Sequence, residues 1–349
     1  MRIICNSAEL SKAAANVQRT VSSKSTIPAL EGILIEAEDG KVILTGYDLE
    51  VGSIIVIDAE VKESGKIILA AKNFCDILRM LPDDSVLLEC DERNICKIKS
   101  GETDYSLIGT AADEYPELPT LSKFSPVKMN LNLLKDMIKR TVFSVSTGER
   151  NPVHSGVKFE IENNNIVLVA VDGARLAIRR EEVDFLYENE EASGKTLEFV
   201  VPAKTLNEVT KLIGDDEETV SLGVGKRHIV FEIGNYSIVS RLLDGEFLNY
   251  KNAIPPTGTS TAIVNTREMI ESIDRTSLII TDKFKSPVRF IFDKDIVRIS
   301  SVTALGTAND SFPCKYEGNK VEIGFNNRYL IESLRSCESG RIRLSLSSP

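Results

Sequence analysis

Two acidic residues stand where a carboxylate could take part in a reaction. The stretch VAVDGARLA, residues 169–177, places Asp172 three residues before Arg175, close enough for a carboxylate and a guanidinium to meet across a turn. The stretch ILTGYDLEVG, residues 43–52, has the same form, with an apolar run, Asp48 and a second apolar run. A catalytic Asp–Arg pair, a pair of carboxylates and a hairpin corner are all compatible with these residues.

Other residue types give little support to catalysis. The chain has two histidines, His154 and His228, and nothing marks either as a base held by an orienting group beside a nucleophile. The GVGK stretch at 223–226 lies in a predicted hairpin turn rather than before a helix, which argues against a phosphate-binding loop. The six cysteines contain no Cys-x-x-Cys pair, so we expect reduced thiols, no bound metal and no other cofactor.

Length and composition indicate a folded chain of several domains. At 349 residues the chain is long for a single core, and 42% hydrophobic with 27% charged residues is typical of a folded soluble protein. The N-terminus lacks a long apolar run and no segment approaches a membrane span, so we expect a cytoplasmic protein without membrane contact. The net charge of −10 argues against a surface that is basic all over, but it leaves room for a local basic face.

The two Asp-containing stretches belong to an internal repeat. GILIEAEDGKVILTGYDLE (32–50) aligns without a gap with GVKFEIENNNIVLVAVDGA (156–174), which places Asp48 on Asp172. A third copy, PVRFIFDKDIVRISSVTA (287–304), has a turn one residue shorter. Apolar runs around a polar turn predict a β-hairpin followed by a corner. Equivalent corners of separate domains keep the two carboxylates apart, so we favour backbone capping as their role.

Helical segments and a further strand repeat in the same order. One helix with an apolar stripe at helical spacing recurs as KNFCDILRML (72–81), KTLNEVTKLI (204–213) and RYLIESLRSC (328–337). Another helix ends in Arg-Thr in every copy, at 19–20, 140–141 and 275–276. The strand YSLIGTAAD (105–113) matches YSIVSRLLD (236–244). Each copy therefore contains two helices and several antiparallel strands.

We therefore expect an α+β fold of three similar domains, 1–122, 128–250 and 260–349, each with two helices packed on antiparallel sheets. The third copy is incomplete, because no partner for its last predicted strand follows RIRLSLSSP. Since an unpaired strand leaves an exposed edge, we expect a C-terminal tail beyond this sequence.

Basic residues follow the repeated helices. The six helical segments carry 13 Lys/Arg against 8 Asp/Glu, although the whole chain is net acidic. Four helices place two basic residues seven positions apart, which is two turns and therefore one stripe. These pairs are Lys12/Arg19, Lys72/Arg79, Lys204/Lys211 and Arg328/Arg335. A solvated face explains one such helix, whereas recurrence in three domains favours a ligand with regularly spaced negative charges, such as duplex DNA bound without regard to sequence.

Several stretches carry a family resemblance that covers essentially the whole chain. They are TIPAL (26–30), LTGYDLE (44–50), VDGARLA (171–177), LLDGEFLNY (242–250) and EIGFN (322–326). Together they resemble the bacterial DNA sliding clamp, the beta subunit of DNA polymerase III. The resemblance implies a non-catalytic processivity factor of DNA replication with the DNA clamp fold. It also implies a homodimeric ring of six domains, with helices lining the hole and sheets forming the outer wall.

The resemblance further implies a pocket that binds short linear peptides. The matching positions are His154, Val171, Gly173, Ala174, Arg175, Leu176, Leu248, Asn252, Ala253 and Ser348. Ala174 stands where relatives often carry a larger side chain and His154 where an aliphatic residue is usual, so we expect a reshaped pocket. Loss of the C-terminal tail is expected to weaken peptide binding. Partners implied in this way are the alpha subunit of DNA polymerase III, an ATP-driven clamp loader, other DNA polymerases and repair proteins.

Residues that face DNA and residues at the dimer contact follow from the same resemblance. The expected DNA-facing residues are Lys12, Lys24, Lys72, Arg79, Arg150 and Lys204. The expected dimer contact sets Tyr105 and Leu107 of one protomer against Leu278 and Ile279 of the other; burial of all four in the core is the alternative. Two other classes of function stay open from the sequence: a DNA-binding regulator that forms no ring, and a hydrolase built on repeated domains.

Overall fold

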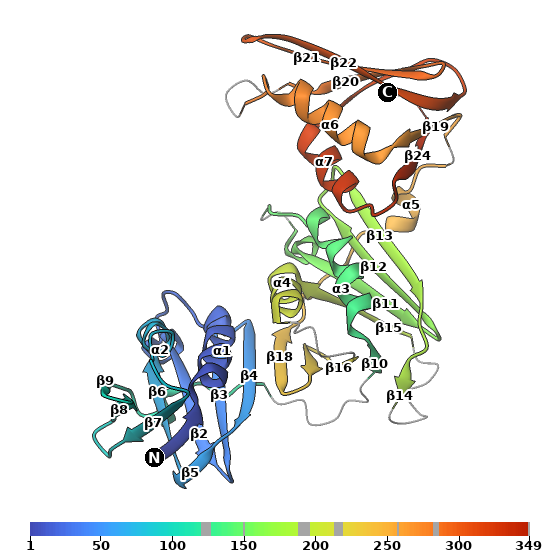
Figure 1. The fold of residues 1–349 in the computed structure, drawn as a ribbon. Coiled ribbons are helices and arrows are strands. Elements are labelled where there is room, and N and C mark those ends of the chain that lie inside the picture. The colour runs from blue at the N-terminus through green and yellow to red at the C-terminus, as the bar shows by residue number, and fades with distance from the viewer. Residues whose placement is uncertain are drawn as a thin grey trace. The chain divides into compact units, whose positions relative to one another are not determined.

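One arrangement of strands and helices recurs three times along the chain. The computed structural model describes residues 1–119, 127–148, 151–187, 196–212, 219–256, 258–281 and 286–347. The chain, whose elements are labelled in Figure 1, divides into two compact units. Unit 1 comprises residues 1–138, 145–169 and 179–245, and unit 2 comprises residues 139–144, 170–178 and 246–349.

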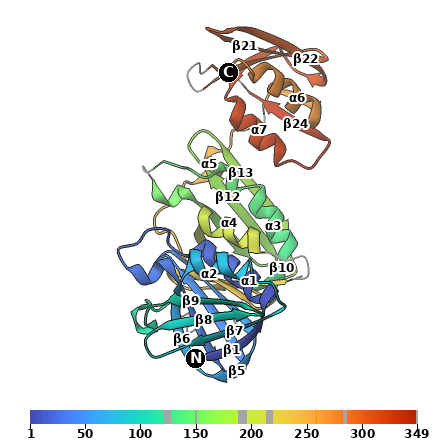
Figure 2. The same ribbon diagram turned by 60° about the vertical axis from the view of Figure 1, so that its left-hand side comes forward.

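Module 1, the first copy, lies entirely in unit 1. Its elements are β1 (Arg2–Asn6), α1 (Ser7–Val17), η1 (Gln18–Thr20), η2 (Pro28–Glu31), β2 (Gly32–Glu38), β3 (Lys41–Tyr47), β4 (Val51–Asp58), β5 (Glu60–Glu63), β6 (Gly65–Ala70), α2 (Ala71–Leu78), β7 (Ser85–Cys90), β8 (Ile95–Ser100), β9 (Thr103–Ile108) and η3 (Ala112–Glu114). Helices α1 and α2 lie side by side (Figure 2).

Module 2 repeats this order, and module 3 repeats it as far as the first strand after its second repeated helix. Module 2 contains β10 (Val127–Asn130), α3 (Leu131–Lys139), η4 (Val142–Ser144), η5 (Pro152–Ser155), β11 (Gly156–Glu162), β12 (Asn165–Val171), β13 (Leu176–Glu182), β14 (Leu186–Tyr187), β15 (Leu197–Pro202), α4 (Ala203–Leu212), β16 (Thr219–Val224), β17 (His228–Ile233) and β18 (Tyr236–Arg241). Module 3 contains α5 (Tyr250–Ala253), β19 (Ser260–Asn265), α6 (Thr266–Ser277), β20 (Val288–Asp293), β21 (Ile296–Thr303), β22 (Gly306–Glu317), β23 (Val321–Phe325), α7 (Asn327–Arg335) and β24 (Arg341–Leu346).

The hairpins and helices predicted from the repeat are confirmed. The shorter turn expected in the third copy is wrong, because a two-residue turn joins the strands in all three hairpins. The three copies form the antiparallel pairs β2–β3, β11–β12 and β20–β21. The segments predicted as helices at 72–81, 204–213 and 328–337 form α2, α4 and α7. In module 3, β24 pairs with β19 and is the edge strand of the sheet β23-β20-β21-β22-β19-β24.

A strand pairing joins the first two modules within unit 1. Strand β18 of module 2 runs antiparallel to β4 of module 1, from Tyr236 opposite Ile55 to Ser240 opposite Val51. The result is one sheet of nine strands in the order β14-β10-β16-β17-β18-β4-β3-β2-β6. The matching strand of module 1, β9, is the edge strand of the sheet β5-β1-β7-β8-β9.

The helices start at equivalent capping residues. The side-chain oxygen of Asn6 accepts a hydrogen bond from the backbone N–H of Glu9, at 3.0 Å. Asn130 and Asn265 do the same at the starts of α3 and α6, at 2.9 and 3.1 Å. Asparagine is a preferred N-cap because its side chain satisfies a backbone N–H that has no partner within the helix. The same cap at the same place in each copy fixes where the helix begins.

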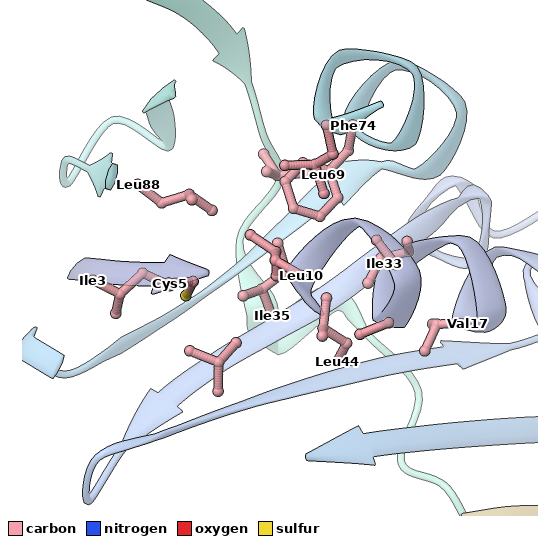
Figure 3. Packing of buried hydrophobic residues seen from close by; sticks show 14 of the residues in the cluster. Ile3, Cys5, Leu10, Val17, Ile33, Ile35, Leu44, Leu69, Phe74 and Leu88 are labelled. Atoms are coloured by element: carbon pink, nitrogen blue, oxygen red, sulfur yellow. The ribbon is translucent and has the colours of Figure 1, made fainter. Parts of the chain in front are cut away.

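Apolar faces of the helices and sheets meet in separate cores. In module 1, side chains from both helices and from strands of both sheets pack together, as Figure 3 shows for Leu10 of α1, Phe74 of α2, Ile33 of β2 and Leu88 of β7, all of which are inaccessible to solvent. In unit 2, α6 and α7 cover the sheet around Phe290. Burial of apolar area at roughly 25 cal/mol per Å² is the main term that holds each module together.

A buried threonine ends the first helix of each module. Thr20, Thr141 and Thr276 are the Thr of the repeated Arg-Thr, and all three are at least 99% buried. The hydroxyl of Thr20 lies 3.0 Å from the carbonyl oxygen of Val17 and 2.5 Å from the hydroxyl of Ser53. The helix end is therefore tied to strand β4 by polar contacts that water does not reach.

Thr20→Val should destabilise the chain, because valine keeps the shape of threonine but leaves the Ser53 hydroxyl without its partner. We expect a loss of about 1–3 kcal/mol in the free energy of unfolding, the usual cost of an unsatisfied buried polar group. Urea unfolding followed by circular dichroism measures it. Thr219→Val, at an exposed strand position, is the matched control and should change little. Equal effects of the two substitutions would contradict this role.

Candidate nucleic-acid and peptide interface

The two repeated corners hold their aspartates as backbone caps. Oδ1 of Asp48 accepts hydrogen bonds from the backbone N–H groups of Glu50 and Val51, at 3.0 and 2.8 Å. Oδ1 of Asp172 accepts them from Ala174 and Arg175, at 3.0 Å each. The capping interpretation of both residues is confirmed by this geometry, and it gives each carboxylate a structural partner at its own corner.

Arg175 is the centre of a polar cluster in unit 2. Its Nε donates to Oδ2 of Asp172 at 2.7 Å, and its Nη2 donates to the carbonyl oxygen of Phe143 at 2.6 Å. Its Nη1 contacts Oε2 of Glu332 on α7. The side chains of Arg175 and Asp172 are largely buried. Each of the three guanidinium nitrogens therefore has a partner, and together these contacts fix the orientation of the guanidinium plane.

Aromatic rings complete the surroundings of Arg175. Its guanidinium carbon lies 4.2 Å from the centre of the Tyr329 ring and 5.4 Å from that of Phe143. Burial alone would lower the pKa of Arg175, but the hydrogen bonds to Glu332 and Asp172 raise it above its usual value. The side chain is a permanent cation held between a ring and two carboxylates.

Asp172 was expected near Arg175 from its spacing in the sequence, but the other residues that hold Arg175 were not. Phe143, Tyr329 and Glu332 come from segments far apart in the sequence, so no spacing pattern could join them to Asp172. The available signal was weak. Glu332 is the acidic residue between the two basic positions of its helix, where a solvated helix face was the simpler interpretation.

A hollow borders this cluster. Its volume is about 770 Å³, and it is lined by Ile280, Thr281, Ser286, Pro287, Asn326, Asn327, Arg328 and Tyr329. Tyr329 lines the hollow and also stacks on Arg175, so the two features share one wall. Aliphatic, aromatic and amide groups together suit a short peptide with an apolar anchor and polar neighbours.

Most of the expected pocket residues belong to unit 2. Val171 is buried at the end of β12, Leu176 is half-buried, and the exposed positions are Gly173, Ala174, Leu248, Asn252 and Ala253. Gly173 has φ +87°, a left-handed conformation that glycine adopts without strain. His154 belongs to unit 1, where burial lowers its pKa. Ser348 lies outside the described residues.

The basic stripes are exposed, and several of their members carry acidic partners. All eight residues of the four predicted pairs are exposed. Arg79 pairs with Asp76 at 3.0 Å and Lys211 with Glu208 at 2.8 Å, while Lys204 contacts Asp48. Arg79 also donates to Oε1 of Gln18 at 3.3 Å, which links α2 to the end of the first helix.

The remaining DNA-facing candidates divide between described and undescribed residues. Lys12, Lys24 and Lys72 are exposed, and Lys12 and Lys72 lie on the neighbouring helices α1 and α2. Exposed basic residues on two adjacent helices suit contact with successive phosphates. Arg150 lies outside the described residues.

The expected dimer residues are at strand and helix ends. Leu278 follows α6 and is 82% exposed, and Tyr105 on β9 is 37% exposed, so neither is a core residue. Ile279 is half-buried, and Leu107 is half-buried against the core of module 1. Ile108, which the sequence analysis did not name, is 85% exposed on the same edge strand.

The described residues hold neither a spanning helix nor a metal cluster. No helix among them combines the length and apolarity needed to cross a bilayer. No group of three or more His, Cys, Asp or Glu side chains in this part of the chain is arranged to hold a metal ion.

Three modules of two helices on antiparallel sheets, with basic helix faces and a polar–aromatic cluster at a hairpin corner, define a DNA clamp fold. Residues 1–119, 128–249 and 251–349 match the N-terminal, central and C-terminal domains of the DNA polymerase III beta subunit. The chain belongs to this family, the bacterial beta sliding clamps.

Individual relatives agree over nearly the whole chain. It is 31% identical to the beta sliding clamp of Bacillus subtilis over 343 residues, 95% of this chain and 89% of the relative. A crystal structure of the sliding clamp from that organism matches with a TM-score of 0.95 at 30% identity, covering 100% of this chain and 93% of the other. The sliding clamp of Bartonella birtlesii, solved bound to griselimycin, matches at 0.91 and 28% identity over 100% and 93% of the two chains.

Arg175→Ala should destabilise unit 2, because it leaves Asp172 and Glu332 without their shared cation. We expect the free energy of unfolding to fall by about 2–3 kcal/mol. This is less than the largest losses seen when a buried ion pair is broken, because Glu332 is partly solvated. Arg267→Ala is the matched control: that arginine also pairs with a glutamate, Glu271, but is exposed, and its loss should change stability very little. Equal effects in urea unfolding would contradict the role of Arg175.

Proposed function

We propose that two copies of this chain close head to tail into a ring of six modules around duplex DNA. The ring has no catalytic activity and holds a DNA polymerase at its template by enclosing the duplex. Family membership supports the sliding clamp function, and the single observation that carries the ring is the β18–β4 pairing, which shows how one module continues the sheet of the next.

The same pairing can be repeated between molecules. Strand β9 matches β18 at an offset of 131, and β9 is an edge strand. In module 3 the strand that matches β4 is the first part of β22, because both follow the repeated hairpin and its capped corner. Within the described residues this part of β22 pairs on one side with β21, while β19 pairs only with its last residues.

The register of the β18–β4 pairing, applied to β9 of one protomer and β22 of its partner, predicts specific contacts between the two protomers. Val239 lies opposite Gly52 at the β18–β4 junction, so Ile108 of one protomer should lie opposite Thr307 of its partner. Ile238 opposite Ser53 likewise gives Leu107 opposite Ala308. An exposed apolar residue such as Ile108 gains most from being covered, which favours closure at this edge.

Across the same interface, we place Tyr105 over α6 of the partner. Its counterpart Tyr236 packs against the core of module 1, and its hydroxyl oxygen lies 3.4 Å from the side-chain nitrogen of Asn16 on α1. The residue of α6 that matches Asn16 is Ser272, which hydrogen-bonds with Asp310 at 3.0 Å. Leu278 and Ile279, just beyond this helix, then flank the contact as the family resemblance implies.

The corner around Arg175 is proposed to bind the short linear motifs of partners. These partners are the alpha subunit of DNA polymerase III, a clamp loader, other polymerases and repair proteins. Support comes from the hollow beside Tyr329, the fixed guanidinium and the exposed residues Leu248 and Ala253 of the same unit. A relative solved with griselimycin shows that a member of this family binds that compound. Arg175, held by Asp172 and Glu332, would serve as a rigid polar wall rather than a mobile contact.

The inner face is proposed to touch DNA weakly. Lys12, Lys24 and Lys72 are exposed, and Lys204 and Arg79 share their charge with nearby acids. Paired cations attract phosphates less strongly, which suits a surface that slides. Arg150 is assigned here by family position alone.

Ile108→Asp should separate the protomers, because it places a charge in an apolar strand contact. We expect the dimer dissociation constant to rise about 30- to 1,000-fold, the range for a central interface residue. Met80→Asp is the matched control, because Met80 is also a highly exposed apolar residue but lies in the turn that follows α2, away from β9 in the sequence. Sedimentation equilibrium measures both variants. A dimer as tight as the original chain would refute the β9 interface.

A loaded ring should remain on nicked circular DNA and leave linear DNA by its ends. A protein held only by 6–10 phosphate contacts would lose roughly 10³–10⁵ in affinity between 50 and 200 mM salt, whereas enclosure is not lost in this way. Gel filtration after loading with a clamp loader and ATP separates bound from free chain. Equal loss from both DNA forms at 200 mM salt would contradict enclosure.

Lys12→Ala combined with Lys72→Ala tests the DNA face in the same assay. The double variant should load onto DNA more slowly than the original chain. Once loaded, it should stay on the nicked circle, because neither substitution opens the ring. Lys62→Ala, an exposed lysine on β5 that pairs with Glu60, is the control and should load normally.

A further inference from the structure

Two cysteines face each other across neighbouring strands of module 1. Strands β7 and β8 are antiparallel, and their register places Cys90 directly opposite Cys96. The two sulfur atoms lie 2.6 Å apart. All six cysteines lie in the part of the chain that the structure describes, and all six are free thiols.

The ladder position of the pair permits a disulfide. The backbone N–H of Cys90 donates to the carbonyl of Met1 on the other side, at 2.8 Å, and that of Asp91 donates to Ile95 at 3.1 Å. Cys90 and Cys96 are therefore a non-hydrogen-bonded antiparallel pair, in which Cα atoms are about 4.5 Å apart. Disulfides span Cα separations of about 4.4–6.8 Å, so the bond needs little backbone movement.

The two thiols differ in their exposure to solvent and in their pKa. Cys96 is fully buried, whereas Cys90 is half-buried and is the one that a small molecule can reach. The hydrogen bond between the two thiols lowers the pKa of Cys90 and, together with burial, raises that of Cys96, so Cys90 is the thiol that ionises first. By contrast, burial raises the pKa of Cys5 to about 12 and that of Cys75 to about 11, which keeps those thiols protonated and unreactive.

We propose that Cys90 and Cys96 form a reversible intramolecular disulfide when the chain meets a low-molecular-weight disulfide. The Cys90 thiolate attacks one sulfur of the oxidant, forms a mixed disulfide and releases one small thiolate. The Cys96 sulfur then attacks the sulfur of Cys90 and releases the second small thiolate. The two protons of the protein thiols pass to these two thiolates. The protein loses two electrons, and the small disulfide gains them.

The bond would lie one strand from the edge of the sheet. Cys96 is paired on its other side with Leu107 of β9, so the three residues form a row across β7, β8 and β9. A covalent link between β7 and β8 would fix the two strands that support β9. This site stands on the geometry of module 1 alone and does not depend on the proposed function.

The test treats the full-length chain with graded ratios of reduced and oxidised glutathione, then alkylates remaining thiols and maps the peptides by mass spectrometry. We expect a peptide pair joined through Cys90 and Cys96 that has lost the mass of two hydrogens and retains no glutathione. Exposed Cys337 should instead carry glutathione as a mixed disulfide, which serves as an internal standard for the oxidant. Reduction should restore both thiols.

Two variants separate the steps. Cys96→Ala should leave glutathione on Cys90, because no second thiol resolves the mixed disulfide, and Cys90→Ser should leave Cys96 free. The proposal is overturned if Cys90 and Cys96 are both alkylated while Cys337 is fully modified. It is also overturned if the two are joined only after urea is added, or if wild-type Cys90 keeps glutathione as the Cys96→Ala variant does.

Discussion

The antiparallel pairing of β18 with β4 is the interaction on which the rest of the structure depends. An edge strand presents a row of unsatisfied backbone groups, and another strand of matching register satisfies them all at once. Because this junction is a continuous sheet, module 1 and module 2 are joined through main-chain hydrogen bonds as well as by the chain itself. Helices α1, α2 and α4, which carry three of the four basic pairs, belong to the two modules that this junction joins.

The distribution of basic residues depends on how the fold positions the helices that carry them. An acidic chain would repel DNA from most of its surface, so basic residues are useful where the fold gathers them. Lys12 and Lys72 come from neighbouring helices of one module. Several other basic residues share their charge with acids, as Lys211 does with Glu208. Weak attraction combined with topological enclosure is the physical requirement for a clamp that must stay on DNA and still move.

The sequence was sufficient to predict what repeats. Hairpins, helices and the capping role of Asp48 follow from local patterns that occur more than once in the chain, and repetition removes the ambiguity of each single copy. The cluster around Arg175 could not be predicted, because Phe143, Tyr329 and Glu332 meet it through tertiary packing. The Cys90–Cys96 contact depends on strand register, which spacing alone does not define.

The intermolecular register is tested most directly by cross-linking. In a chain whose Cys90 and Cys96 are replaced by alanine, Leu107→Cys together with Ala308→Cys should give a covalent dimer under mild oxidation, because the two positions correspond to Ile238 and Ser53 of the β18–β4 junction. Leu107→Cys with Thr303→Cys, out of register, should not. A covalent dimer from the first pair alone is the predicted result. No cross-link from the first pair, or equal cross-linking from both, would contradict a ring closed by the β9 edge.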